Sequence, residues 1–267
     1  MSETTKLSIS SITLFKACRR AYELKKIYGV EPVKRAEALE TGSSYHKMVE
    51  NLHRTGEVPE LSTKETAMAI AYARYIYPKM PKFEPEVWFE KPFGRGNIIV
   101  GRADGIVVDE SAIVEHKTTS TDIDQYEYDL QWNEQLLTYF LATGVRKAYY
   151  TICRKPTIRQ KQSESDYEFA QRCLDWYDED TNSKIRMIKV SRTYEEVSQY
   201  KKSLSKMFSE IKRAKSRGNY YRNTCHCHAW GRQCEYAPIC LHYDPEQEYV
   251  GFERRTYEDN KHSGQYF

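Results

Sequence analysis

Long apolar runs are missing from this sequence of 267 residues, and the longest are short ones such as Leu136–Leu137 and Phe140–Ala142. A transmembrane helix needs about 20 consecutive apolar residues, so no membrane partner is expected. Residues 1–11 are polar and lack the apolar core of a secretory signal. We therefore expect a cytoplasmic protein. Its seven cysteines should be thiols or metal ligands rather than disulfides, because the cytoplasm keeps thiols reduced.

Internal repeats and low-complexity linkers are also missing, which argues against a solenoid or a disordered connector. Hydrophobic residues make up 40% and charged residues 30% of the chain, the balance of a soluble globular protein. A chain of this length can bury one sizeable core, so a single domain over residues 1–267 is expected. The net charge of +3 is small for a protein that coats duplex DNA through charge alone.

Hydrophobic spacing predicts helices first, then strands, then helices before an irregular end. The expected helices cover 11–28 with Ser10 or Ser11 as cap, a stretch beginning near 41–44, 63–77, 130–141, 164–178 and 193–217. The expected strands cover 87–93, 98–108, 112–117 and 147–154. This order predicts an α/β fold with a mixed central β-sheet flanked by helices. Its parts are an N-terminal helical part (1–80), an α/β core (81–160), a helical part (161–222) and a cysteine-rich segment (223–267).

The most informative stretch runs from Gly101 to Lys117 and reads GRADGIVVDESAIVEHK. If its two strands form a hairpin with a tight turn at 109–110, Asp104 lies directly opposite Glu115. Opposed residues on antiparallel strands hold their Cβ atoms about 4.5–5.5 Å apart. Lys117 follows Glu115 by two residues and shares its face. One sheet face is therefore expected to present two carboxylates and an ammonium.

Two buried carboxylates repel each other unless a cation neutralises them. Mg²⁺ or Mn²⁺, as one or two ions, suits oxygen ligands, and Lys117 can then orient or deprotonate a metal-bound water. The alternative is that Asp104 and Glu115 lie exposed on an edge hairpin and simply pair with Lys117. The spacing alone leaves both interpretations open.

Two helical pairs bear on this choice. His46 precedes Glu50 by four residues, so both can share one helix face, and Gln135 and Tyr139 share a face in the same way. Each pair is uninformative alone, because a lone helix histidine is more often structural than a ligand.

Together the motifs at 41–46, 101–105, 115–118 and 135–139 resemble those of the PD-(D/E)XK nuclease superfamily. Their order is similar to that of the RecB-like nucleases, including the CRISPR-associated RecB-like exonucleases and phage-encoded relatives. The resemblance implies a restriction-endonuclease-like core. It implies metal ligation by His46, Asp104, Glu115 and the backbone carbonyl of His116. It further implies catalysis by Lys117 with Asp104 and Glu115, and positioning by Gln135 and Tyr139.

Four cysteines, Cys225, Cys227, Cys234 and Cys240, fall within one short stretch, CHCHAWGRQCEYAPIC. Clustered cysteines in a cytoplasmic protein indicate a metal site. One alternative is a structural zinc site formed by all four, with a histidine such as His226, His228 or His242 as a further ligand. Two other cysteines, Cys153 and Cys173, lie inside regular elements and are expected to be buried.

The resemblance implies a different arrangement, because iron–sulfur members of the RecB-like nucleases place one cysteine in the first helix and three near the C-terminus. Here those would be Cys18, Cys227, Cys234 and Cys240, holding a 4Fe–4S cluster. The spacing departs from the commoner family pattern, since six residues separate Cys227 from Cys234. The choice between Cys225 and Cys227 therefore stays open.

Three functions are consistent with these patterns. The first is a metal-dependent DNA exonuclease, which the resemblance implies acts on DNA ends, commonly 5′→3′ on single strands, in recombination, replication or repair. The second is a catalytically weak DNA-binding protein that serves as a recombination or CRISPR-adaptation partner. The third is a zinc-stabilised nucleic-acid module. Ring-forming relatives exist in this superfamily, but no heptad or apolar stripe in this sequence demands assembly, so a homo-oligomer stays an open alternative.

Overall fold

The computed structural model describes residues 4–33, 37–94 and 96–255. The chain divides into two compact units. A terminal unit contains residues 1–35, 89–101 and 198–267, and a central unit contains 36–88 and 102–197. Within the described ranges, no helix combines the length and the apolar character that a bilayer crossing requires.

The main sheet is mixed, as the sequence predicted. Its order is β1-β4-β5-β6-β7, and β3 also pairs with β4. β1 and β4 are parallel, as are β5 and β6, whereas β4–β5 and β6–β7 are antiparallel. The strands are β1 (Thr5–Leu7), β3 (Glu84–Pro92), β4 (Asn97–Val107), β5 (Ala112–Thr119), β6 (Lys147–Arg154) and β7 (Ile185–Ser191). Neither β1 nor β7 was predicted, because β1 is short and the charged Arg186 and Lys189 interrupt the apolar pattern of β7.

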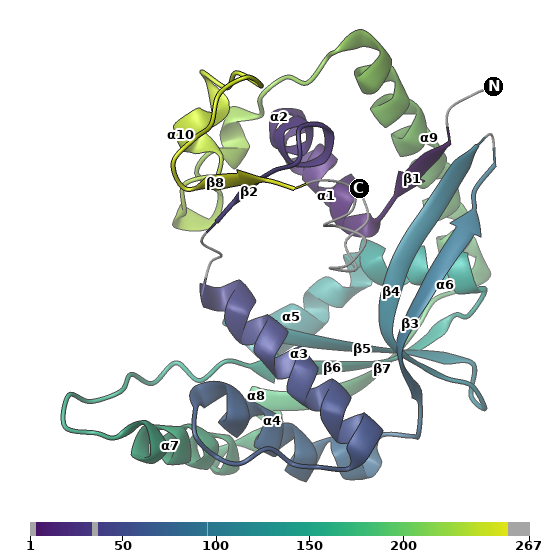
Figure 1. Ribbon diagram of the computed structural model, residues 1–267. Helices are drawn as coiled ribbons and strands as arrows, with labels where there is room; N and C mark the ends of the chain where they lie inside the picture. The colour runs from purple at the N-terminus through teal and green to yellow at the C-terminus, as the bar shows by residue number, and fades with distance from the viewer. Residues whose placement is uncertain (1–3, 34–36, 95, 256–267) are drawn as a thin grey trace. The chain divides into compact units, whose positions relative to one another are not determined.

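Three helices of the central unit pack on one face of its sheet (Figure 1). They are α3 (Glu37–Thr55), α4 (Lys64–Tyr75) and α7 (Asp166–Glu179). Tyr45 and Val49 of α3, Tyr72 of α4 and Tyr177 of α7 are fully buried with Val114 of β5 in one hydrophobic core. Cys153 and Cys173 belong to this core and are 0% exposed, as predicted. Thr63 begins α4 with a reciprocal capping box to Thr66.

Shorter helices follow β5 on the other face of the sheet. They are α5 (Ile123–Asp129), the 3-10 turn η3 (Leu130–Trp132) and α6 (Glu134–Thr143). The short α8 (Thr181–Lys184) lies between α7 and β7, and the turn η2 (Tyr77–Lys79) follows α4. Tyr126 of α5 contacts Tyr150 of β6, whose side chain alternates with the core-facing Tyr149. The helix predicted over 130–141 begins only at residue 134, because Asn133 caps α6 by accepting from the N–H of Leu136.

The terminal unit contains both ends of the described chain. It comprises α1 (Ile9–Ala17), α2 (Arg19–Tyr22), the π-helical turn η1 (Glu23–Ile27), β2 (Val30–Pro32), most of α9 (Tyr194–Arg217), η4 (Thr224–His226), η5 (Ala229–Gly231), α10 (Ala237–Cys240) and β8 (Phe252–Arg254). β2 and β8 pair antiparallel. Gly29 precedes this pair at φ +67°, and a Cβ there would lie 2.4 Å from the carbonyl oxygen of Arg255.

The prediction of one helix over 11–28 is wrong. Cys18 is extended, with φ −159° and ψ 116°, and separates α1 from α2. The sulfur of Cys18 accepts from the N–H of Asn223, 3.4 Å away. That distant partner cannot be read from local spacing. Ser8, rather than Ser10 or Ser11, caps α1 by accepting from the N–H of Ser11.

The β4–β5 hairpin has the predicted register, which pairs Gly105 with Val114 and Val107 with Ala112. Its turn closes through a 3.1 Å hydrogen bond from the N–H of Ser111 to the carbonyl of Val108. Ser111 takes a left-handed φ of 49°, so the turn does not need glycine at 109–110. One further step along the ladder puts Asp104 opposite Glu115.

Two glycines on β4 make room for aromatic rings, one from β3 and one from the residue just before it. A Cβ on Gly101 would lie 2.4 Å from Cζ of Phe89, and a Cβ on Gly105 would lie 2.1 Å from Cδ2 of Phe83. Both distances are too short for real atoms. The glycines that bracket Asp104 are therefore explained by packing.

We expect Gly105→Ala to lower the free energy of unfolding by about 1–3 kcal/mol, the usual cost of overpacking a core. Urea unfolding of the wild type and the variant measures this difference. Phe83→Ala provides the control, because removing the ring should make Gly105→Ala cost much less in that background. An equal cost in both backgrounds would contradict the steric explanation.

Candidate active site

Asp104, Glu115 and Lys117 converge on one face of the hairpin in the central unit. Glu115 is 2% exposed, and its Oε1 forms an ion pair with Nζ of Lys117. Both residues point away from the core formed by α3, α4 and α7, because Ala112 and Val114 occupy the alternate, core-facing positions of β5. The interpretation of an exposed edge hairpin is therefore wrong for Glu115, which is buried.

α3 brings His46 to this group. Nδ1 of His46 lies 3.5 Å from Oδ1 of Asp104. Gly42 stands one turn earlier in α3, where a Cβ would come within 3.2 Å of Oγ1 of Thr118. A side chain at Gly42 would therefore press against β5 immediately beside Lys117.

His116 contributes its backbone to the site and its ring to the opposite face. Its N–H donates to Oδ2 of Asp104 at 2.7 Å. Because the N–H and C=O of one strand residue point to the same side, its carbonyl faces the Asp104 edge as well. Nδ1 of the ring lies 2.7 Å from Oγ1 of Thr151 on β6. Burial lowers the pKa of this imidazole to about 3, so the ring is neutral.

α6 places two predicted residues in a hydrogen-bonded chain. Nε2 of Gln135 donates to Oε1 of Glu115 and to the hydroxyl of Tyr139, at 2.7 Å in each case. The Tyr139 hydroxyl donates to the backbone carbonyl of Arg102 at 2.8 Å. The chain connects α6 to both strands of the hairpin. All predicted site residues of the central unit are thus together.

The two carboxylates differ in charge state. Burial raises the pKa of Glu115 to about 7, an effect that the nearby Asp104 carboxylate increases and Lys117 opposes. Burial also acts upward on Asp104, but the hydrogen bond and charge of His46, with smaller effects from His116 and Lys117, hold its pKa below the usual range. Burial would lower the pKa of Lys117, yet the two carboxylates raise it. Asp104 is therefore ionised at neutral pH while Glu115 is near its midpoint.

One oxygen of Glu115 is suited to bind a cation. Oε2 is buried and has no hydrogen-bond partner among the described residues. A buried carboxylate oxygen without a partner is costly, and a divalent ion would satisfy it. As the side chains stand, no trio of His, Cys, Asp and Glu within the described ranges is drawn together tightly enough to bind a metal. Lys117 now provides the positive charge at Glu115.

Glu86 was not predicted as a site residue, yet the structure brings it to the neighbourhood of Asp104. This residue of β3 has a left-handed φ of 59° and forms an ion pair with Arg102. Burial raises its pKa, Arg102 opposes that rise, and the carboxylates of Glu50 and Asp104 add to it. Glutamate within a strand carries no local signal for such a conformation.

The terminal unit brings together the four cysteines that the resemblance implies. A small cavity of about 20 Å³ is lined by Cys18, Ala21, Arg222, Asn223, His226, Cys227, Cys234, Tyr236, Ala237 and Cys240. Cys225 is exposed and does not line it. The N–H of Cys234 donates to the carbonyl of Cys227 at 2.8 Å, which fixes these two segments against each other.

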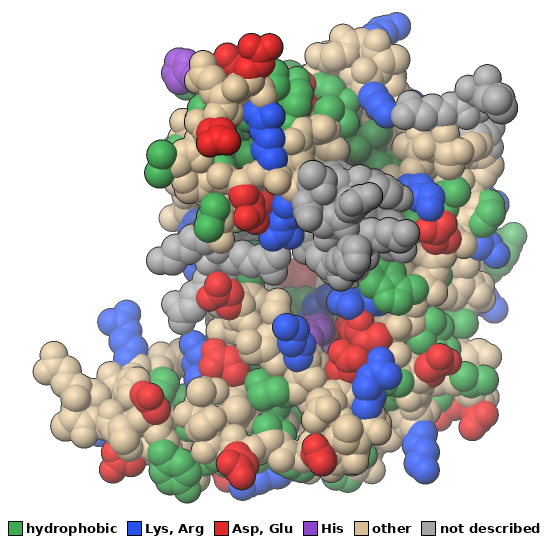
Figure 2. All heavy atoms as spheres, in the orientation of Figure 1, with side chains coloured by type: hydrophobic (Ala, Val, Ile, Leu, Met, Phe, Trp, Pro, Cys, Tyr) green, Lys and Arg blue, Asp and Glu red, His purple; other side chains and the backbone are tan. Residues whose placement is uncertain are grey.

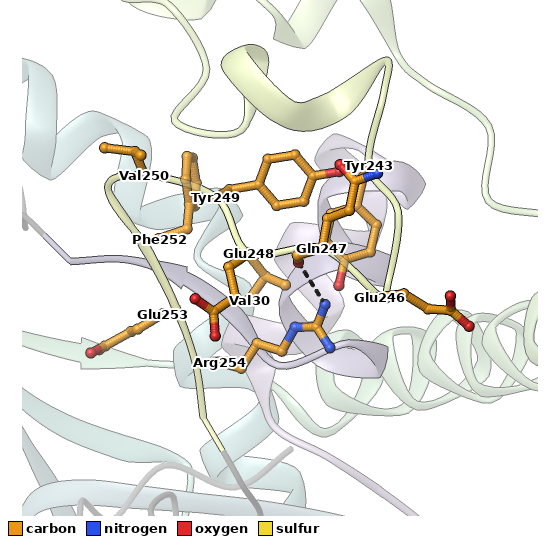
Figure 3. A pocket seen from close by; sticks show the side chains of 10 residues that line it. All are labelled: Val30, Tyr243, Glu246, Gln247, Glu248, Tyr249, Val250, Phe252, Glu253 and Arg254. Carbon is orange, nitrogen blue, oxygen red and sulfur yellow. Dashed lines mark hydrogen bonds between the residues drawn. The ribbon is translucent and has the colours of Figure 1, made fainter.

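A larger cavity, about 610 Å³, lies elsewhere in the terminal unit (Figure 3). Val30 and the segment from Tyr243 to Arg254 line it, and Arg254 donates to the carbonyl of Gln247 across it. No predicted site residue lines this cavity. On the face shown in Figure 2, acidic and basic side chains are interspersed.

A sequence model of the PD-(D/E)XK nuclease superfamily matches residues 6–84 and 59–241. No curated protein matches the chain in sequence. Among solved structures, a protein from Eubacterium rectale is 14% identical over 92% of this chain and 90% of its own, with a TM-score of 0.47. An alkaline exonuclease from Laribacter hongkongensis is 14% identical over 80% and 93%, with a TM-score of 0.36. A phage-related exonuclease from Haemophilus somnus 129PT is 14% identical over 72% and 94%, with a TM-score of 0.35.

The family match spans most of the chain and includes the α3 histidine, both hairpin carboxylates, the lysine and the α6 pair. The chain belongs to the PD-(D/E)XK nuclease superfamily.

Proposed function

We propose that this protein is a metal-dependent DNA exonuclease that hydrolyses phosphodiester bonds from DNA ends. The convergence of Asp104, Glu115 and Lys117, with an unpartnered buried oxygen on Glu115, carries the proposal. From the resemblance to RecB-like nucleases alone, we extend it to single-stranded substrates degraded 5′→3′ in recombination, replication or repair, and to a cytoplasmic location.

Asp104, Glu115, the His46 ring and the carbonyl of His116 would hold Mg²⁺ or Mn²⁺, as one or two ions. When bound, such a metal supplies an activated water and neutralises charge on the phosphate oxygens. His46 and the His116 N–H keep Asp104 ionised and oriented. Gln135 fixes one oxygen of Glu115, which leaves Oε2 available.

Lys117 is suited to work as a cation. Its pKa is raised, so it remains an ammonium at neutral pH. An ammonium beside the carboxylates can hydrogen-bond the attacking water and stabilise the negative charge that develops on the phosphate oxygens. The alternative of a catalytically weak DNA-binding or CRISPR-adaptation partner would not require this charge at the reacting centre.

Lys117→Ala should reduce Mn²⁺-dependent degradation of end-labelled linear DNA about 100-fold or more, as loss of one charge-stabilising donor does elsewhere. Lys202→Ala, a change at an exposed lysine of α9, is the control and should retain activity. Closed circular DNA should resist the wild type, because the proposed enzyme needs ends. Equal residual activity in wild type and Lys117→Ala would remove the nuclease assignment and favour the binding alternative.

Metal affinity should depend on pH because Glu115 must lose its proton before it binds a cation. Its raised pKa of about 7 means that the proton competes with the metal below pH 7, whereas Asp104 is already ionised there. Calorimetric titration with Mn²⁺ should therefore show affinity falling below pH 7, with a slope that approaches about tenfold per pH unit, and levelling off above it. Glu115→Gln should bind weakly at every pH. A wild-type affinity that is constant from about pH 5.5 to about 8.5 would contradict this account.

We further propose that Cys18, Cys227, Cys234 and Cys240 hold a 4Fe–4S cluster. Their common cavity supports this set. Burial raises the pKa of the Cys240 thiol, and the charges of Arg20 and Arg222 oppose that rise. The cavity of about 20 Å³ accommodates roughly one water, so the four thiols would have to spread to admit a cluster.

Anaerobically purified Cys227→Ser protein should lose its iron and acid-labile sulfide, because one of the four cluster ligands is gone. Cys225→Ser is the matched control, two residues away and outside the cavity, and should keep both. Elemental analysis with sulfide determination measures the outcome. Zinc without iron in the wild type would replace the cluster by the structural zinc alternative, and iron loss in Cys225→Ser alone would reassign the ligand.

A further inference from the structure

We propose that Trp88 and Arg102 form a nucleotide-binding subsite beside the candidate active site. In this subsite the guanidinium binds a backbone phosphate next to the one being cleaved, and the indole stacks on an unpaired base. The substrate class, single-stranded DNA, rests on the proposed function. The subsite itself rests on the geometry of β3 and β4.

Arg102 lies on the same face of β4 as Asp104. Ala103, Gly105 and Val107 are buried, whereas Arg102 and Asp104 occupy the alternate, more accessible positions. Residues two apart on a strand are about 7 Å apart, so the side chains of Arg102 and Asp104 leave β4 as near neighbours. The Tyr139 hydroxyl donates to the Arg102 carbonyl at 2.8 Å. The backbone of Arg102 is therefore fixed to the series of hydrogen bonds that reaches Glu115 through Gln135.

The Arg102 side chain is accessible and already holds an anion. Its guanidinium lies 5.2 Å from the centre of the Trp88 ring and forms an ion pair with the Glu86 carboxylate. The arginine side chain is 46% exposed and Trp88 is 42% exposed. Guanidinium groups recognise carboxylate and phosphate with the same paired geometry. The Glu86 carboxylate therefore marks the position that a phosphate group can take.

The backbone of Glu86 has a left-handed conformation. A non-glycine residue with a positive φ is strained, and within β3 the φ of 59° directs its carboxylate toward Arg102 and the neighbourhood of Asp104 and Glu50. A phosphate must displace this carboxylate to reach Arg102. A strand anchored at the metal site can do so more readily than a free anion, because its phosphates are held at high local concentration.

Trp88 supplies the second half of the subsite. A large aromatic ring that is 42% exposed and carries a guanidinium over its face is a poor core residue and a good stacking surface. Bases stack on aromatic side chains without regard to sequence, which suits an enzyme that removes nucleotides successively. The competing explanation is that Trp88 only shields the Arg102–Glu86 ion pair, and it predicts no effect on DNA affinity.

Fluorescence anisotropy in EDTA, with a labelled single-stranded oligodeoxynucleotide of about 12 nucleotides, tests the subsite without cleavage. Trp88→Ala should weaken binding about tenfold, and Trp88→Phe should retain most of the affinity. Arg102→Lys should also weaken binding although the charge is kept, because lysine lacks the planar fork. Glu86→Gln should strengthen binding, because the internal competitor is neutralised.

Two control variants and a modified substrate sharpen the result. Glu84→Gln removes an exposed carboxylate from the same strand without touching Arg102, and Tyr167→Ala removes an exposed aromatic residue from α7. Both should bind like the wild type. Moving a single abasic site along the oligonucleotide should identify one position where the wild type loses affinity and Trp88→Ala loses none, which a folding defect cannot imitate.

The subsite is overturned if Trp88→Ala binds within about twofold of the wild type, the range of ordinary surface substitutions. Equal effects of Glu86→Gln and Glu84→Gln would also overturn it, since only general repulsion would then be at work. Failure here is separable from failure of the nuclease proposal. Unaltered binding with intact Mn²⁺-dependent degradation removes only the subsite, whereas Trp88-dependent binding without any degradation removes only the nuclease.

Discussion

The proximity of two carboxylates in a buried place is the constraint on which the rest of the central unit depends. His46 keeps the pKa of Asp104 low, and the N–H of His116 donates to its carboxylate, so Asp104 stays ionised. Burial and the nearby Asp104 carboxylate raise the pKa of Glu115, which favours its neutral form. Lys117 offsets part of this cost at one oxygen and leaves the other without a partner. The negative charge of such a site is only partly neutralised by the protein, and this is the property by which carboxylates bind a divalent cation.

Each surrounding element has a local reason to be where it is. Glycines on β4 admit the rings of Phe83 and Phe89, and Gly42 lets α3 approach β5 closely enough for His46 to reach Asp104. The cap at Asn133 starts α6 so that Gln135 falls in its first turn, opposite Glu115. The glycines and the cap residue of these motifs therefore have a structural role, because they set the distances between the candidate site residues.

Local rules predicted the parts of the molecule whose causes are local. The hairpin register followed from turn length, and the common face of Glu115 and Lys117 followed from strand alternation. The break at Cys18 and the left-handed Glu86 escaped prediction, because a partner far away in the chain holds each of them. Spacing also left Cys225 and Cys227 equivalent, and only the folded cavity separates them. Where two residues have the same local sequence pattern, only their positions in the folded structure distinguish them.

The terminal unit is assembled from the first 35 residues, a short internal piece and the segment from 198 to 267. Leu24, near the start of this unit, packs with Tyr236 and Ile239, near its end, so these partners are absent until the last segment has been translated. The central unit is encoded between the two segments and can complete its own core before that. The terminal unit, assembled from distant segments, is therefore the later of the two to fold.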